Sequence, residues 1–96
     1  MSNFTTLFNK HRDTLDTYVP VVSRVHGPSH PVFYDVEKQY QAITSKMDKD
    51  SSANIDAEFI ALRKITDDYA IPSDTCETYE AVYNMLNELD RAYSQK

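Results

Sequence analysis

Apolar and aromatic side chains recur at steps of three and four along most of the chain, as they do on one face of an α-helix. Four segments carry this spacing, and none carries a convincing two-residue alternation typical of a strand. The first predicted buried face consists of Phe4, Phe8, His11, Leu15, Tyr18, Val22 and Val25. This pattern predicts one long N-terminal helix.

Two prolines and the single glycine predict where this first helix bends and where it ends. Pro20 removes a backbone donor, but the apolar spacing continues in phase beyond it, so we expect a kink rather than a break. Gly27 follows the last turn as a C-terminal cap, and Pro28 prevents continuation. The helix should therefore end near His26.

A polar linker separates the second and third predicted helices. Pro31 suits the first position of the second helix, where its missing N–H has no partner to lose. The apolar face of that helix consists of Phe33, Val36, Tyr40, Ile43 and Met47. The linker runs from Asp48 to Asn54. The third apolar face consists of Ile55, Phe59, Leu62, Ile65 and Tyr69, and Pro72 soon turns the chain away from helix.

The fourth predicted helix begins with Asp74 as its cap and Glu77 three residues later. Its apolar face consists of Tyr79, Val82, Tyr83, Leu86, Leu89 and Tyr93. Four amphipathic helices with short connections predict an all-α, antiparallel four-helix bundle. The 96 residues suffice for one small core, so we expect residues 1–96 to form a single helical domain.

Charge and cysteine content narrow the function classes. The net charge is −5 and no basic cluster occurs, which argues against nucleic acid as a partner. The N-terminus lacks a signal-peptide pattern, and no apolar segment approaches the ~20 residues of a membrane span. The single cysteine, Cys76, rules out an internal disulfide framework and fits a reducing compartment. We therefore expect a cytoplasmic protein that does not enter the membrane.

Two sequence blocks carry a family resemblance: RVHGPSHP (residues 24–31) and IPSDTCETY (residues 71–79). With KHRDTL (residues 10–15) and the run LRKITDDYAIPSDTCETYEAVYNMLNEL (residues 62–89), they resemble, in order and spacing, the repair-of-iron-centres family. These hemerythrin-like di-iron proteins are implicated in mending iron-sulfur clusters after oxidative or nitrosative stress. The resemblance implies a four-helix bundle that holds two irons through histidines and carboxylates. Several of these stand four apart and so share one helix face.

The resemblance places His26 on a family ligand position and His11 near the family's early histidine pair. Where the family has a central histidine and glutamate, this chain has Met47, Asp48 and the serine-rich linker. An ungapped extension from the cysteine block puts the final ligand histidine at Lys96 and its glutamate beyond the end of the chain. The resemblance therefore implies a shortened relative that lacks most metal ligands.

The candidate metal ligands are His26, His11 and His30. Neither a Glu-x-x-His nor a His-x-x-x-Glu pattern occurs in the sequence. His11 and His26 would stand ~22 Å apart on one straight helix, too far to share a metal within one chain. Each histidine also has a structural alternative, which is a core or interface position for His11, a helix C-terminus for His26 and a turn for His30.

Two further groups have a functional and a structural interpretation. Cys76 stands at the start of the fourth helix, where the dipole can stabilise a thiolate, or it is a small buried residue. The acidic cluster of Asp67, Asp68, Asp74, Glu77 and Glu80 offers carboxylates, but it surrounds a helix boundary and serves equally as cap and solvated face.

Two function hypotheses stay open. The first is a non-catalytic helical interaction module, a dimer or a partner subunit, with a degenerate di-iron site and no cofactor in the isolated chain. The second is an active iron-handling or cluster-repair protein that completes an iron site with a second chain or partner. A classical enzyme is not expected, since the sequence lacks a phosphate loop, a nucleophile with its base, and a cysteine pair for zinc.

Overall fold

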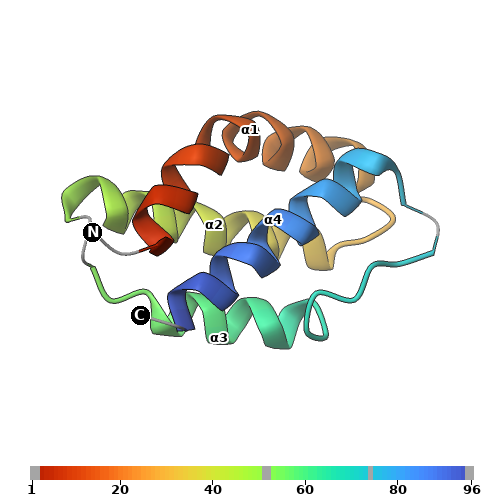
Figure 1. Cartoon of the computed structure of the whole chain (residues 1–96). Coiled ribbons are helices and arrows are strands. Elements are labelled where there is room, and N and C mark those ends of the chain that lie inside the picture. Colours follow the sequence, from red (N-terminus) through yellow and green to blue (C-terminus); the bar gives the residue numbers. More distant parts are fainter. Residues whose placement is uncertain (1–2, 51–52, 74, 95–96) are drawn as a thin grey trace.

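The computed structural model describes residues 3–50, 53–73 and 75–94 and places four α-helices in them (Figure 1). Their bounds are α1 (Asn3–His26), α2 (Val32–Lys49), α3 (Asp56–Ile65) and α4 (Glu77–Ser94). These ranges contain no strand, so the all-helical prediction is confirmed. The helices pack into a compact globule with a Cα radius of gyration of 12.6 Å.

Helix α1 packs against α4 and α2, and α2 also packs against α3. Figure 1 shows the α1–α2 turn and the α3–α4 connection at one end of the molecule, and the α2–α3 connection at the other. The C-terminal end of α1 therefore lies beside the N-terminal end of α4. Residues 50 positions apart in the sequence meet there, as His26 and Cys76 do.

The apolar faces predicted for the second and fourth helices are buried at every position. The face predicted for the first helix is partly wrong, because Val25 is 61% exposed and Val19, which was not predicted, is buried. At 3.6 residues per turn, Val25 stands about 120° around the helix from Val19. The predicted positions alternate steps of four and three, a mean of 3.5 residues, which drifts against the helical repeat of 3.6 residues. The predicted stripe therefore lies to one side of the true contact face.

Gly27 ends α1 for a different reason from the one predicted. Among the described residues no glycine has a positive φ, so Gly27 is not a left-handed cap. It is buried, and its N–H donates a hydrogen bond of 3.0 Å to the carbonyl oxygen of Ser23. A Cβ at this position would overlap that carbonyl oxygen and the Tyr34 ring. The glycine therefore provides the space in which the following turn folds back onto α1.

Helix α2 begins one residue later than predicted, with Pro31 at the N-cap, and continues to Lys49. The predicted linker is therefore wrong at Asp48, which is helical and forms an ion pair with Arg12 on α1. Residues 51–52 of the linker lie outside the described ranges. The helix therefore includes two residues of the predicted linker, Asp48 and Lys49, and the ion pair with Arg12 stabilises Asp48 there.

Helix α3 ends at Ile65, so its predicted apolar face continues beyond the helix. Asp67, Asp68 and Tyr69 follow with φ values of 54°, 60° and 64°, in the left-handed region. Tyr69 is nevertheless buried, because this turn carries its ring back into the core. The predicted capping residue of the fourth helix, Asp74, lies outside the described ranges.

Candidate functional site

The end of the molecule where α1 stops and α4 starts gathers two of the three histidines around one aromatic ring. His26 Nε2 lies 3.1 Å from Cys76 Sγ. The imidazole rings of His26 and His30 both meet the Tyr79 ring edge to face, each with centroids 5.6 Å apart. Tyr79 is completely buried, so it fixes the positions of both imidazoles. The structure thus brings together His26, His30 and Cys76.

His11 lies apart from this group, nearer the middle of α1. Its Nε2 is 2.5 Å from Glu88 Oε2 on α4, and the histidine is half-buried while the glutamate is exposed. His11 also lines a groove between α1 and α4, together with Thr14, Tyr18, Ala81, Asn84, Met85 and Glu88. This groove has a volume of about 490 Å³. Its lining includes His11 and Tyr18, which the sequence had placed on the buried face.

The interior between the helices at the Tyr79 end is filled by aromatic rings. Phe33, Tyr79 and Tyr83 are each at most 1% exposed. The Tyr79 and Tyr83 ring centroids lie 4.9 Å apart, and the Phe33 and Tyr79 centroids 5.1 Å apart. The hydroxyls of Tyr79 and Tyr83 share a hydrogen bond of 3.2 Å, and burial raises the pKa of Tyr83.

A hemerythrin-like iron pair requires several histidines and carboxylates that converge in the middle of a bundle. In residues 3–50, 53–73 and 75–94, no three histidine, cysteine, aspartate or glutamate side chains are placed to hold a metal ion. The described residues therefore do not fit a di-iron centre within this single chain. The assignment of His26, His11 and His30 as metal ligands stays a prediction.

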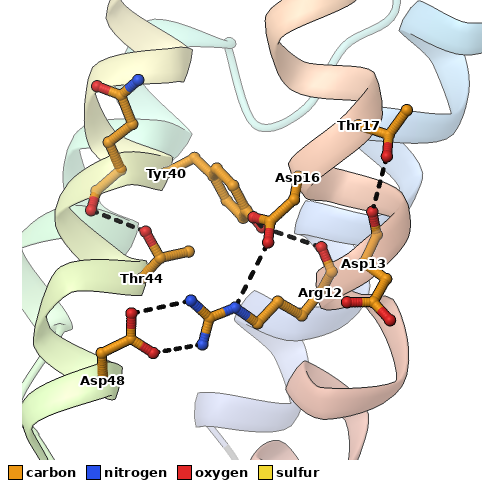
Figure 2. A network of polar contacts seen from close by, with 8 residues as sticks. Arg12, Asp13, Asp16, Thr17, Tyr40, Thr44 and Asp48 are labelled. Carbon is orange, nitrogen blue, oxygen red and sulfur yellow. Dashed lines mark hydrogen bonds and ion pairs between the residues drawn. The ribbon is translucent and has the colours of Figure 1, made fainter.

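Two polar networks that were not predicted from the sequence connect the helices. In the first, the Arg12 guanidinium forms two hydrogen bonds with the Asp48 carboxylate and also contacts Asp16 (Figure 2). Asp16 accepts a hydrogen bond of 2.7 Å from the hydroxyl of Tyr40. Burial and the Asp16 carboxylate raise the pKa of Tyr40, and the hydrogen bond from Arg12 lowers that of Asp48. This network holds α1 against α2.

The second network surrounds Asp90 on α4, which is only 4% exposed. Its Oδ2 accepts hydrogen bonds from the Tyr69 hydroxyl at 2.7 Å and from Arg63 Nε at 2.9 Å. The sequence did hold a signal for this network, because Asp90 follows Tyr83 by seven residues and so falls on the buried face. A carboxylate at such a position requires a partner.

An ion pair between the exposed Lys46 and the buried Glu58 connects α2 with α3. Lys46 Nζ lies 2.7 Å from Glu58 Oε2, and Glu58 is 7% exposed. The other carboxylate oxygen, Oε1, is buried and has no hydrogen-bond partner in the described part of the chain. Lys46 therefore compensates the charge of the buried Glu58 carboxylate through only one of its two oxygens.

Comparison with known proteins finds a distant similarity to an iron-sulfur cluster repair protein. The chain is 24% identical, over an alignment 110 positions long, to "Iron-sulfur cluster repair protein ScdA" of Staphylococcus haemolyticus (strain JCSC1435). The chain is distantly related to this repair protein. The similarity covers 80% of the chain and 50% of ScdA, so the chain spans about half the length of this relative. No family model matches the chain. No solved structure matches it significantly.

None of the helices in the described ranges is long and apolar enough to cross a membrane.

Proposed function

We propose that this chain is a non-catalytic helical interaction module related to iron-sulfur cluster repair proteins, in which the di-iron site has degenerated. The observation that carries this proposal is that each of the three histidines contacts other side chains of this chain and that His11 lies apart from His26 and His30. His11 pairs with Glu88, His26 contacts Cys76, and His30 packs on the buried Tyr79 ring. Aromatic side chains fill the interior where converging metal ligands would be needed.

We further propose that the four helices form an antiparallel, hemerythrin-like bundle in one domain, with α1 kinked at Pro20. The neighbouring pairs α1 with α4, α1 with α2, and α2 with α3 are those of an up-and-down arrangement. Pro20 lies inside α1 and removes one backbone donor, which is the usual cause of a sharp kink. We also propose a cytoplasmic location, which the single cysteine supports, and a role in the stress response, which the relation to an iron-sulfur cluster repair protein supports.

The groove between α1 and α4 is the surface that we assign to a protein partner or to a second copy of the chain. Tyr18 and Met85 give it an adaptable apolar floor, and the His11–Glu88 pair forms a polar border. We expect Met85→Glu to weaken association at least tenfold, measured by sedimentation equilibrium for self-association or by pull-down for a partner. Asn9→Glu, an exposed change on α1 away from the groove lining, is the control. Equal association of both variants would argue against this surface.

Iron content tests the degenerate-site proposal. After anaerobic reconstitution of the untagged chain with ferrous iron and desalting, we expect well under one iron per chain. We also expect His26→Ala to leave that content unchanged. A content of two irons per chain that is lost in His26→Ala would overturn the proposal, because it would require a site assembled from residues that are apart in this structure.

A second function is supported by the grouping at the Tyr79 end. His26, His30 and Cys76 are ligand types that suit iron or zinc, and Cys76 is exposed. Two chains that met at this end would contribute six such groups, so an iron-handling protein could complete its site with a second chain. Iron that is retained only in the dimer fraction of a size-exclusion separation would favour this function over the first.

A further inference from the structure

We propose that a pocket between α3 and α4 binds a small zwitterion of the α-amino-acid class, with the ligand carboxylate at Arg63 and Arg91 and the ligand ammonium group at Asp68. The pocket has a volume of about 330 Å³, near the lower end of the ~300–1,000 Å³ that small-molecule sites occupy, so it suits a ligand of few atoms. Its lining consists of Arg63, Asp68, Asn87, Asp90, Arg91 and Ser94. The inference involves neither the histidines nor the groove between α1 and α4, so it is independent of the proposed interaction function.

The pocket exists because α3 and α4 are joined mainly by side chains rather than by close backbone packing. Helix α3 packs against α2, and α4 packs against α1. Asp90 on α4 connects the two helices, since its Oδ2 accepts hydrogen bonds from Arg63 Nε at 2.9 Å and from the Tyr69 hydroxyl at 2.7 Å. The pocket lies beside this connection, and both Arg63 and Arg91 line it.

Both guanidinium groups are anchored through one nitrogen and keep their other donors for a ligand. Arg63 uses Nε for Asp90, and Arg91 uses Nε for a hydrogen bond of 3.1 Å to Asn87 Oδ1. Within residues 3–50, 53–73 and 75–94, neither guanidinium forms another hydrogen bond. A guanidinium whose orientation is already fixed loses less side-chain entropy when its remaining N–H groups bind a carboxylate. Because the Asn87 oxygen accepts from Arg91, the Asn87 amide nitrogen remains a donor to the same carboxylate.

The negative side of the pocket is Asp68. This residue has a φ of 60°, in the left-handed region that aspartate adopts more readily than most residues. Its N–H donates a hydrogen bond of 2.7 Å to the Arg63 carbonyl oxygen, which holds Asp68 close to the end of α3. Asp68 is exposed, and its carboxylate forms no hydrogen bond or ion pair with the part of the chain that the structure describes. The carboxylate is therefore available to an ammonium group, for which Ser94 Oγ at the pocket is a second acceptor.

The mixture of charges around the pocket selects the class of ligand. Arg63 and the Tyr69 hydroxyl already compensate Asp90, so Arg91 and Asp68 are the unlike charges that lack a charged partner among the described residues. A phosphate dianion would be repelled by Asp68, and a simple cation would be repelled by the two guanidinium groups. A molecule with a carboxylate and an ammonium group on neighbouring atoms complements both signs, and α-amino acids have this arrangement.

The test follows ligand binding to the full chain by heteronuclear NMR, in a buffer without phosphate. Each standard L-amino acid is titrated in turn, and we expect at least one to bind saturably with a Kd below about 10 mM. The amide signals of residues 87–94, which contain four of the lining residues, should shift. The N-acetyl derivative of that amino acid lacks the ammonium charge, and its α-amide lacks the carboxylate. We expect each derivative to bind about fivefold more weakly, which is the upper range for an exposed ion pair.

Two variants separate the contributions of the two charges. Arg91→Gln should weaken binding of the amino acid about fivefold without weakening that of the α-amide, which has no carboxylate. Asp68→Asn should weaken the amino acid by a similar factor without weakening the N-acetyl derivative. Both residues are exposed, and asparagine also adopts the left-handed conformation readily, so we expect both variants to fold. Lys64→Gln is the matched control, because it removes one exposed positive charge from α3 outside the pocket lining, and it should bind like wild type.

The absence of saturable binding by any L-amino acid would overturn the proposal. Equal affinities for the amino acid and either derivative, or equal effects of Arg91→Gln and Lys64→Gln, would do the same. Tighter binding of inorganic phosphate than of every amino acid would show an anion site instead and would also reject the proposal. These titrations do not measure association through the groove between α1 and α4, so their failure leaves the proposed interaction function unaffected.

Discussion

Tyr69 and Asp90 are joined by a hydrogen bond of 2.7 Å between the tyrosine hydroxyl and Asp90 Oδ2, and both residues are buried. They stand 21 residues apart, on the left-handed turn after α3 and on α4. Arg63 Nε donates to the same oxygen at 2.9 Å and compensates its charge. The bond therefore ties an unusual backbone turn to the buried face of another helix.

Removing the Tyr69 hydroxyl should destabilise the fold. In Tyr69→Phe the buried Asp90 carboxylate loses one of two donors, so we expect the free energy of unfolding to fall by about 1.5 to 3 kcal/mol. Urea denaturation, monitored by circular dichroism, measures this free energy of unfolding. Tyr34→Phe is the matched control, because Tyr34 is 48% exposed, and it should change the value by less than ~0.5 kcal/mol. Equal effects of the two changes would show that the Asp90 bond adds nothing to stability.

Alkaline pH should unfold the protein through its buried tyrosines. Burial raises the pKa of Tyr40, Tyr69 and Tyr83 in the fold, with hydrogen bonds adding to the effect. Above the unfolded tyrosine value of about 10, the folded chain keeps protons that the unfolded chain has lost. Unfolding then releases protons, so stability is fully present below about pH 10 and falls as the pH rises, by about 1.4 kcal/mol per pH unit for each such tyrosine.

Absorbance at 295 nm, which follows phenolate formation, and circular dichroism at 222 nm test this together. We expect part of the phenolate signal to appear only as the helix signal is lost. Tyr83→Phe should lessen the dependence of stability on pH above 10. Complete ionisation of all tyrosines with the helices intact would contradict the prediction.

Gly27→Ala should destabilise the protein by steric overlap. The new Cβ would lie about 2.5 Å from Tyr34 Cε1 and would also crowd the Ser23 carbonyl oxygen. We expect a loss of about 1 to 3 kcal/mol, as for other overpacked positions. In the Tyr34→Ala background the cost of Gly27→Ala should be smaller, because the ring is then gone. An unchanged cost would mean that Tyr34 does not constrain this position.

The sequence by itself determined where the helices lie. Pro28 and the glycine before it end α1, and the steps of three and four in α2 and α4 identify their buried faces, because local geometry and apolar burial act through near neighbours. The apolar spacing could not predict the left-handed turn at residues 67–69, because packing of Tyr69 and its hydrogen bond to Asp90 on another helix hold that conformation. Val25 was misplaced because the predicted spacing drifts around the helix, and only the packed structure shows which side of α1 is buried.

For the candidate site, too, the sequence indicated the residues, and the tertiary structure decided which of them are in contact. Sequence reasoning grouped His26, His11 and His30 as candidate metal ligands and considered Cys76 separately. Only the tertiary structure decided that His26 meets Cys76 at 3.1 Å while His11 pairs with Glu88. The physical reason is that a helix fixes spacing along its own axis, whereas contacts across 50 or 77 residues depend on how helices pack against one another.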